Sequence, residues 1–210
     1  MKYLKMLGLA VVAVTALMAV VGAGTASATV LCDSTTTPCA QKWAANTQLE
    51  FEVVPGTEGI WETTGGQVIA ACSEGELKGT PTAGGASATV KMPVQASDWD
   101  WVSSSCTVQA NTLEGGELEI HAISGSDNGT VTATGFNFTT TAFGASCIYG
   151  FAKATDIGTL TASGTGNAIL DVNTVFTKIS GSLICPADLK WSEQFRQVKP
   201  SGTGLYVEPS

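Results

Sequence analysis

The sequence predicts an all-β fold, either an antiparallel β-sandwich of Greek-key or Ig-like type or a barrel-like sheet, cross-linked by disulfides and preceded by a signal peptide. Three observations support this. Apolar and polar residues alternate with a period of two in several short segments. Clusters rich in glycine and threonine separate these segments, as turns separate strands. No segment after Ala28 shows a capped helical pattern over three turns.

The alternation is clearest in residues 47–54 and 87–94. In the first segment, Phe51 and its apolar neighbours occupy one face, and the polar face carries Glu52. In the second, Pro93 lacks the N–H that a strand ladder needs, so we expect this strand at a sheet edge or a bulge. Further strands are expected at residues 67–72, 147–153, 158–161, 168–178 and 189–198.

Residues 116–138 predict a β-hairpin. Two β-rich runs flank the sequence Asp127-Asn128-Gly129. Asn-Gly is the pair that best tolerates the positive φ angles of a tight two-residue turn. We therefore expect the turn of this hairpin at Asn128 and Gly129.

Six cysteines indicate a disulfide framework. All of them lie after Ala28: Cys32, Cys39, Cys72, Cys106, Cys147 and Cys185. An even number of cysteines in an exported chain is typical of disulfides, although their spacing alone leaves the connectivity open. No C-x-x-C sequence is present that would favour a zinc site or a redox pair.

A weak internal repeat favours one connectivity. The segments GTPTAGGASATV and GTLTASGTGNAI begin at Gly79 and Gly158, and Cys106 and Cys185 have the same offset of 79 residues. If each half closes its own loop, the pairs are Cys72–Cys106, Cys147–Cys185 and a local Cys32–Cys39. Chance similarity between segments rich in glycine, threonine and alanine is the alternative explanation of the repeat.

The chain is expected to divide into a signal peptide, residues 1–28, and one β domain, residues 29–210. Lys2 and Lys5 precede an uncharged apolar run, and small residues ending in Ala28 follow it, which is the order of a cleaved export signal. A retained anchor is the alternative, but the apolar run is short for a membrane span. We expect a secreted or cell-wall-associated domain with no stable membrane anchor after cleavage.

The charge of the chain argues against nucleic acid as a partner. The formal net charge is −8, and cleavage removes two positive charges, Lys2 and Lys5, which leaves −10. An acidic domain with scattered cations repels phosphate backbones. The partners that remain are an extracellular or cell-wall glycan, or a protein.

The sequence offers no catalytic constellation. His121 is the only histidine, and no G-x-S-x-G elbow or phosphate-binding glycine loop is present. Three pairs of carboxylates are two residues apart, so each pair would share one face of a strand: Glu50 and Glu52, Asp98 and Asp100, Glu117 and Glu119. Glycosidases use two neighbouring carboxylates, but the same spacing is typical of a solvated strand face. Asp98 and Asp100, or Asp127 and Asn128, fit no complete calcium loop. We expect no enzyme activity, no cofactor and no metal.

The segment SDWDWVSSSC suggests a binding site. Trp99 and Trp101 alternate with Asp98 and Asp100 just before Cys106. Exposed aromatic faces stack on sugar rings, and carboxylates accept hydrogen bonds from sugar hydroxyls. Alternatively, the tryptophans pack at the sheet edge beside Cys106. We expect one of them to pack there and the other to lie partly exposed.

Nearly the whole mature chain resembles a group of small, secreted, uncharacterised actinobacterial proteins. The resemblance rests on the signal peptide with the Cys32–Cys39 loop, and on TPTAGGASATV, LEIHAISGSDNGTVTATG, CIYG, LICPADLKWSEQFRQVKP and LYVE. It implies export and a disulfide-bonded β domain, and it carries over no catalytic residue. SDWDWV is not among the shared segments. The sequence thus predicts a non-enzymatic structural or interaction domain, with a carbohydrate-binding module that uses Trp99 and Trp101 as the alternative.

Overall fold

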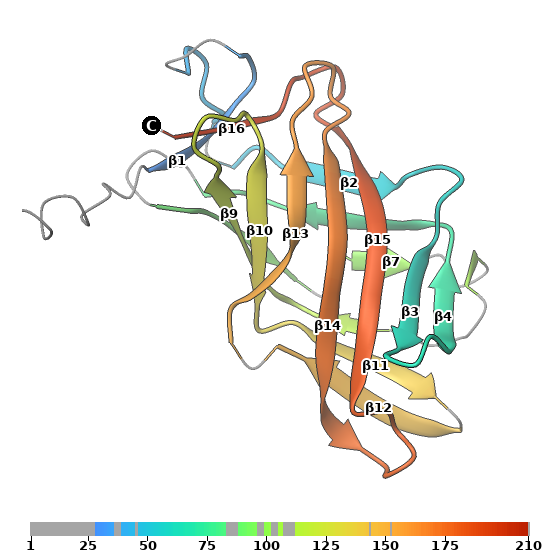
Figure 1. Cartoon of the computed structure of the whole chain (residues 1–210). Coiled ribbons are helices and arrows are strands. Elements are labelled where there is room, and N and C mark those ends of the chain that lie inside the picture. Colours follow the sequence, from blue (N-terminus) through green and yellow to red (C-terminus); the bar gives the residue numbers. More distant parts are fainter. Residues whose placement is uncertain are drawn as a thin grey trace, which may run out of the picture.

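The computed structural model describes residues 28–35, 39–44, 46–82, 88–95, 99–101, 105–106, 112–142, 144–151 and 153–209. The predicted signal peptide lies outside these residues, apart from Ala28. The described residues form an all-β fold in which every strand pairing is antiparallel, as the alternation predicts (Figure 1). In this part of the chain, no helix has the length and apolar character that crossing a membrane requires.

The strands are β1 (Thr29–Cys32), β2 (Leu49–Val53), β3 (Gly59–Thr63), β4 (Val68–Cys72), β5 (Gly75–Gly79), β6 (Val90–Val94), β7 (Trp99–Trp101), β8 (Thr112–Glu114), β9 (Gly116–Ala122), β10 (Gly129–Thr134), β11 (Asn137–Ala142), β12 (Ala145–Gly150), β13 (Thr155–Thr161), β14 (Ile169–Gly181), β15 (Asp188–Lys199) and β16 (Tyr206–Pro209).

The long hairpin β14–β15 is the centre of the main sheet. One half of β14 pairs with β13 and the other half with β12. In the same way, β15 pairs with β3 through residues 189–192 and with β2 through residues 195–199. The sheet therefore forks on both sides of the hairpin. One branch holds β6, β9, β10, β13, β2, β5 and β7, and the other holds β8, β11, β12, β3 and β4 (Figure 1).

The larger branch curls until its two ends approach each other. A Cβ atom added to Gly79 of β5 would lie 2.5 Å from Cγ of Met92 in β6, so these strands are in close contact although they are not paired. Among the described strands, β6 pairs only with β9. The edge position that Pro93 predicts is thus confirmed, and the curled sheet encloses the core.

Aromatic rings fill the core of the smaller branch. Trp61 is 1% exposed and stacks between Phe138 and Trp191, with centroid distances of 5.2 and 5.9 Å. Phe176 lies 4.3 Å from Phe151 and 5.7 Å from Trp191, measured between ring centroids. Strands β3, β11, β14 and β15 therefore meet through one continuous aromatic cluster. Trp191 itself is 4% exposed.

A two-stranded sheet, β1 with β16, covers one end of the larger branch. The Thr29 hydroxyl donates to the carbonyl of Ala88 and accepts from the N–H of Ala122. Val207 donates its backbone N–H to the carbonyl of Asp127, which ties β16 to the β9–β10 loop. This arrangement brings the two ends of the domain together.

The predicted hairpin forms from β9 and β10, but its tight turn is not at Asn-Gly. The positive φ is at Gly125, and Gly129 already pairs with Ala122 as the first residue of β10. Asn128 instead accepts a hydrogen bond from Ala162 N–H with its side chain, at 2.8 Å. The predicted position of the turn was wrong, because Asn128 bonds to the distant Ala162 and Gly129 already pairs within β10.

All three predicted disulfides are present: Cys32–Cys39, Cys72–Cys106 and Cys147–Cys185. They are consistent with an extracellular location. The repeat that suggested them is not reproduced by the strand pairing. The repeat aligns β5 with β13, yet β13 pairs with the strand that follows it and β5 does not pair with β6. The two halves therefore have disulfide loops of similar length, 34 and 38 residues, but they do not share a structural unit.

Candidate functional site

The fork beside β15 creates a groove. The connection from β2 to β3 and the connection from β4 to β5 both cross between the two branches at this point. Between them lies a groove of about 720 Å³. It is lined by Glu52, Val53, Pro55, Gly56, Ser73, Glu74, Gly75 and Glu76. Its size is within the range typical of small-molecule sites.

Three carboxylates face this groove, from Glu52, Glu74 and Glu76. Glu52 and Glu76 are directly opposed across β2 and β5, so they lie on the same face of the sheet. Glu76 forms an ion pair with Lys78. Among the described residues, no salt bridge neutralises Glu52 or Glu74. The groove therefore offers hydrogen-bond acceptors and negative charge.

The walls of the groove are held in place by local contacts. The Ser105 hydroxyl accepts from the Glu74 N–H at 3.1 Å and donates to the Glu74 carbonyl at 3.2 Å. The neighbouring disulfide, Cys72–Cys106, joins the end of β4 to the segment after β7. On the other wall, Thr57 donates both its N–H and its hydroxyl to the Val54 carbonyl. A groove held in this way is preorganised for a ligand.

The predicted Trp-Asp-Trp segment is strand β7, and it lies beside this groove. β7 pairs with β5, which supplies part of the groove wall. The register sets Asp100 opposite Glu76, Trp99 opposite the buried Leu77, and Trp101 opposite Gly75. Asp98 and the side chains of Trp99, Asp100 and Trp101 lie outside the described part of the structure. The backbone thus brings the predicted segment next to carboxylates that the sequence did not connect with it.

The other predicted carboxylate pairs have separate environments. Glu50 is not solvated, as the alternation suggested, but is 5% exposed and paired with Lys199 at 2.8 Å. Glu117 and Glu119 share Lys91, at 2.6 and 3.1 Å, and their hydrogen bonds raise the pKa of Lys91. Among the described residues, no group of three or more His, Cys, Asp or Glu side chains is arranged to hold a metal ion.

His121 is half-buried on β9. Its Nε2 lies 3.2 Å from the hydroxyl of Thr132, which is on the neighbouring strand β10. Such a contact orients the ring, and it involves none of the residues that line the groove. His121 is therefore a partly buried strand residue outside the groove.

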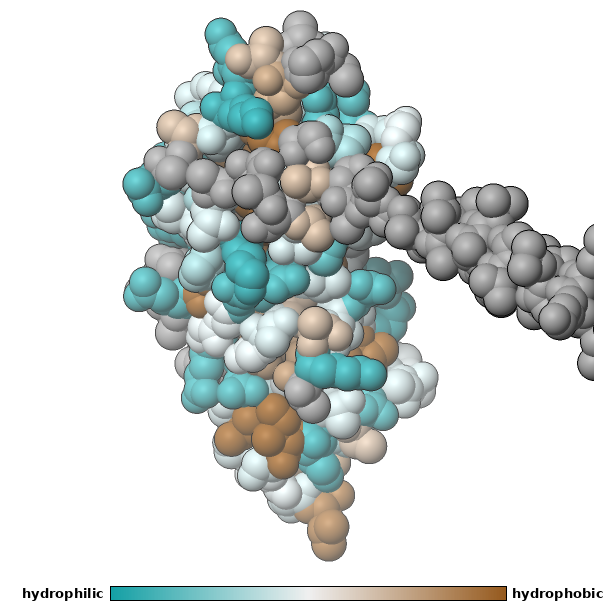
Figure 2. Space-filling model, turned by 90° about the vertical axis from the view of Figure 1, so that its left-hand side faces the viewer, coloured by the Kyte–Doolittle hydropathy of each residue, from teal (hydrophilic) through white to brown (hydrophobic). Residues whose placement is uncertain are grey.

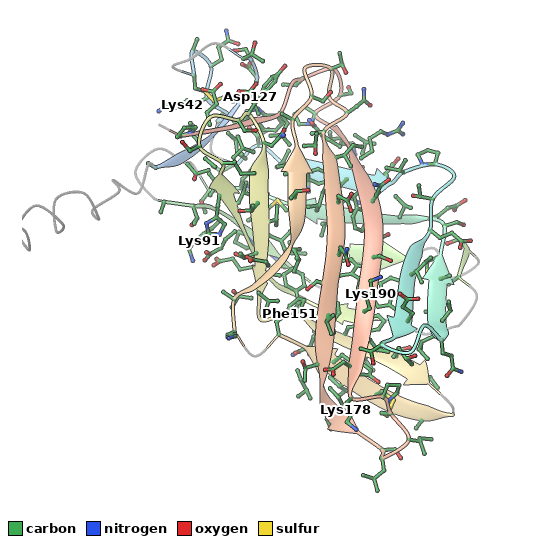
Figure 3. The ribbon with its side chains drawn as sticks, in the orientation of Figure 1. Lys42, Lys91, Asp127, Phe151, Lys178 and Lys190 are labelled. Carbon is green, nitrogen blue, oxygen red and sulfur yellow. A yellow bond between two sulfur atoms is a disulfide. The ribbon has the colours of Figure 1, made fainter. Side chains whose placement is uncertain are left out.

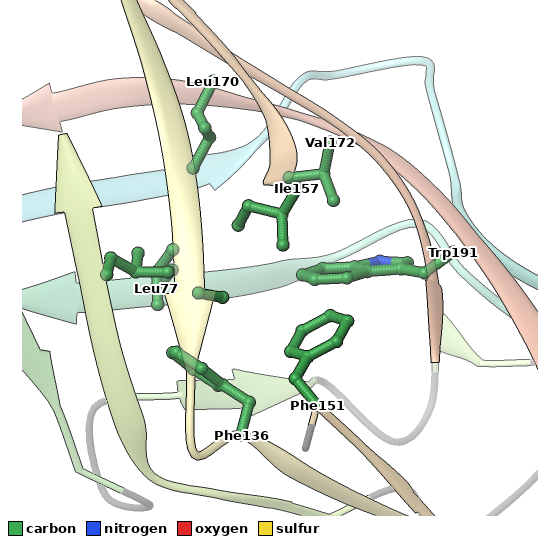
Figure 4. A pocket seen from close by; sticks show the side chains of 9 residues that line it. Leu77, Phe136, Phe151, Ile157, Leu170, Val172 and Trp191 are labelled. Carbon is green, nitrogen blue, oxygen red and sulfur yellow. The ribbon is translucent and has the colours of Figure 1, made fainter. Parts of the chain in front are cut away.

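A second, much smaller hollow lies in the core. It is lined only by apolar residues, which Figure 4 shows converging from several strands: Leu77, Leu118, Ala133, Phe136, Phe151, Ile157, Leu170, Val172 and Trp191. It offers no polar group that would orient a ligand, whereas binding sites combine apolar walls with a few such groups. The groove at the fork is therefore the candidate site.

Glu193 and Glu208 are buried acids that the sequence did not reveal, and Glu193 is the one whose pKa burial raises furthest. Glu193 is 3% exposed and accepts a hydrogen bond from the indole N–H of Trp191 at 2.8 Å. Its other oxygen has no hydrogen-bond partner among the described residues. Gly59 leaves room for this carboxyl, because a Cβ there would lie 2.6 Å from Cδ of Glu193. Glu193 and Trp191 are two residues apart in β15, so both side chains lie on the inward face of the strand. This spacing could have indicated the burial of Glu193, but a charged side chain is not expected on an inward face.

Burial raises the pKa of Glu193 well above 4.5, while the hydrogen bond from Trp191 acts in the opposite direction. Since the pKa is higher in the folded state than in the unfolded chain, the folded state binds the proton more tightly. The stability that this group contributes is complete below about pH 4.5, and it is lost as the pH rises towards the folded-state pKa.

Replacing Glu193 with glutamine should remove this pH dependence. Above pH 4.5, we expect the free energy of unfolding of Glu193→Gln to rise relative to that of the wild type by up to about 1.4 kcal/mol per pH unit. Denaturant unfolding of both proteins between pH 4 and pH 8 measures the difference. Glu58→Gln, at an exposed acid, is the control. A difference that stays constant over this range would mean that Glu193 is ionised in the folded protein.

Comparison with known proteins found no family model, no curated protein and no solved structure that matches this chain.

Proposed function

We propose that this chain is an exported, non-catalytic binding domain, secreted or held at the cell wall, and that the groove at the fork binds carbohydrate. The observation that carries the proposal is the position of the groove. Its carboxylates, Glu52, Glu74 and Glu76, lie beside strand β7, where the register sets Asp100 opposite Glu76 and Trp99 opposite the buried Leu77. Export is supported by the order of segments before Ala28 and by the three disulfides.

Carbohydrate suits the chemistry of the groove. Sugar hydroxyls donate hydrogen bonds, and hydrogen bonds to ionised carboxylates are stronger than those to neutral acceptors. A protonated amino sugar would gain further from the charges of Glu52 and Glu74, which form no salt bridge among the described residues, although Arg196 is opposite Glu52 across β15 and β2. Phosphorylated or sulfated ligands would instead be repelled by the same charges. The ligand class is therefore a neutral or amino-sugar glycan.

The arrangement favours binding over hydrolysis. A glycosidase needs one carboxylic acid that stays protonated and positioned at the scissile bond. Among the described residues, the acid whose pKa is raised well above its ordinary value is Glu193. It is buried, and it lines a separate hollow of about 290 Å³ with Glu58 and Asp171 instead of the groove at the fork.

The test is a glycan array with a chain starting at Thr29, followed by titration of the best ligand. We expect Glu52→Gln/Glu74→Gln to weaken binding at least tenfold, because loss of one charge-assisted hydrogen bond costs about 1.5 kcal/mol or more. The matched control, Glu117→Gln/Glu119→Gln, neutralises two acids outside the groove and should bind like the wild type. Absence of any glycan ligand, or equal binding by the groove variant, would refute the proposal.

The tryptophans are tested in the same assay. If a ring of β7 stacks on the sugar, Trp99→Ala or Trp101→Ala loses binding and keeps the melting temperature of the wild type. If the ring instead packs beside Cys106, the substitution lowers the melting temperature. Measuring binding and melting for each variant separates the two roles.

A further inference from the structure

The tip of the β14–β15 hairpin exposes a group of aliphatic side chains. Residues 179–187 form this hairpin tip, at the bottom of Figure 1. Within it, Leu183 is 98% exposed, Ile179 56% and Ile184 55%. Figure 2 shows hydrophobic surface at the lower tip of the molecule and a larger hydrophobic area in its lower half. Exposed aliphatic side chains gathered on one protruding tip indicate a contact surface.

The hairpin tip is also uncharged. No Asp, Glu, Lys or Arg occurs in residues 179–187, in a chain of formal net charge −8. The neighbouring strand β12 pairs with β14 at Cys147–Gly181 and Ile148–Ser180, and residues 137–151 carry no charged side chain either. Lys178 lies just above the tip in Figure 3. The hairpin tip itself therefore carries no charge that would oppose its transfer from water to an apolar phase, and the nearest charges, Lys178 and Asp188, flank it.

The shape of the hairpin tip is fixed by contacts with the rest of the domain. The Cys147–Cys185 disulfide joins it to β12. The Tyr149 hydroxyl donates to the Pro186 carbonyl at 3.1 Å. The aliphatic side chains are thus presented on a braced loop, and little conformational entropy remains to be lost when they are buried.

Several backbone groups of the hairpin tip already have partners inside the protein. Cys185 N–H donates to the Ser182 carbonyl at 3.0 Å, and Ile184 N–H lies 3.5 Å from the Ser182 hydroxyl. Lys178 donates its N–H to the Ala187 carbonyl and its ammonium group to the Cys185 carbonyl. Internal pairing of this kind is what a loop needs in order to leave water without losing hydrogen bonds.

We propose that the hairpin tip inserts reversibly into the interfacial region of a lipid bilayer, with Leu183 and Ile184 as the inserted side chains. A protruding aliphatic tip, several of whose backbone groups are paired inside the protein, fits lipid. A protein interface would instead be expected to centre on Trp, Tyr or Arg, which dominate binding hot spots. Because the domain is acidic, zwitterionic lipid is favoured over anionic lipid. This is a peripheral contact, and it does not depend on what the groove binds.

The test uses a chain that starts at Thr29, which keeps all 16 described strands and removes the apolar N-terminal segment. Flotation with phosphatidylcholine vesicles should recover the wild type in the lipid fraction. We expect Leu183→Ser/Ile184→Ser to lower the partition coefficient at least tenfold. The matched control is Val68→Ser, since Val68 is 52% exposed at a different hairpin. It should partition like the wild type, and all variants should have similar melting temperatures.

Three results would overturn the proposal. One is a wild type that stays in the aqueous fraction. Another is a Leu183→Ser/Ile184→Ser variant that floats as well as the wild type. The third is stronger, salt-sensitive binding to vesicles that contain anionic phosphatidylglycerol, since this would assign the contact to cationic residues. If lipid binding is absent and sedimentation velocity shows a dimer that only the tip variant loses, the hairpin tip contacts a second copy of the chain instead.

Discussion

Replacing Trp61 with alanine is expected to lower the free energy of unfolding by about 3–5 kcal/mol, the usual cost of truncating a buried aromatic side chain. Trp61 is 1% exposed and stacks on Phe138 and Trp191 with nearly parallel rings. Its removal would leave a cavity between β3, β11 and β15, and the rigid neighbouring rings cannot collapse to fill it.

Guanidinium unfolding monitored by far-UV circular dichroism measures this loss. Val68→Ala is the control on the same β3–β4 hairpin, because Val68 is 52% exposed and its truncation should change the stability by less than about 0.5 kcal/mol. A Trp61→Ala variant within 1 kcal/mol of the wild type would show that the ring stack is not the centre of the core.

Removing the Cys147–Cys185 disulfide should cost about 4 kcal/mol in the chain-entropy model, because it closes a loop across 38 residues. The cross-link acts mainly on the unfolded chain, whose freedom it reduces. The double variant Cys147→Ala/Cys185→Ala removes it without leaving reactive thiols. Both residues are buried, so the loss of their packing adds to the effect.

The short disulfide supplies the internal comparison. Cys32 and Cys39 are 7 residues apart, and the same model gives about 2.4 kcal/mol for their cross-link. Denaturant unfolding of the two double-alanine variants should therefore rank the long loop as the more stabilising. The reverse order, or a loss below 1 kcal/mol for Cys147→Ala/Cys185→Ala, would contradict the entropic argument for this protein.

Most of the predictions about single strands came from the alternation of apolar and polar residues along the sequence. Strand β2 has its apolar residues buried and Glu52 exposed, as a period of two requires. Pro93 marks an edge strand because a missing N–H excludes it from the middle of a sheet. β1 and β16 were not predicted. Each is only four residues long, and each pairs with a partner at the other end of the chain.

The parts of the candidate site were visible in the sequence only as fragments. Glu52 belonged to a polar strand face, Glu74 and Glu76 to no predicted element, and Trp99 and Trp101 to a separate motif. The fork of β15 between β2 and β3 sets these segments side by side. A fork depends on which strands pair over long sequence separations, and no local pattern encodes that choice.

The sequence by itself determined the all-β class and the inward apolar faces of strands such as β2, because residue periodicity is a local property of the chain, whereas the spacing of the cysteines left their pairing open. Only the tertiary structure decided the burial of Glu193 beside Trp191, the role of Asn128 as an acceptor for Ala162, and the groove at the fork. Each of these depends on an atom supplied by a distant strand or loop, and it is the packing of the whole core that brings such atoms within contact distance.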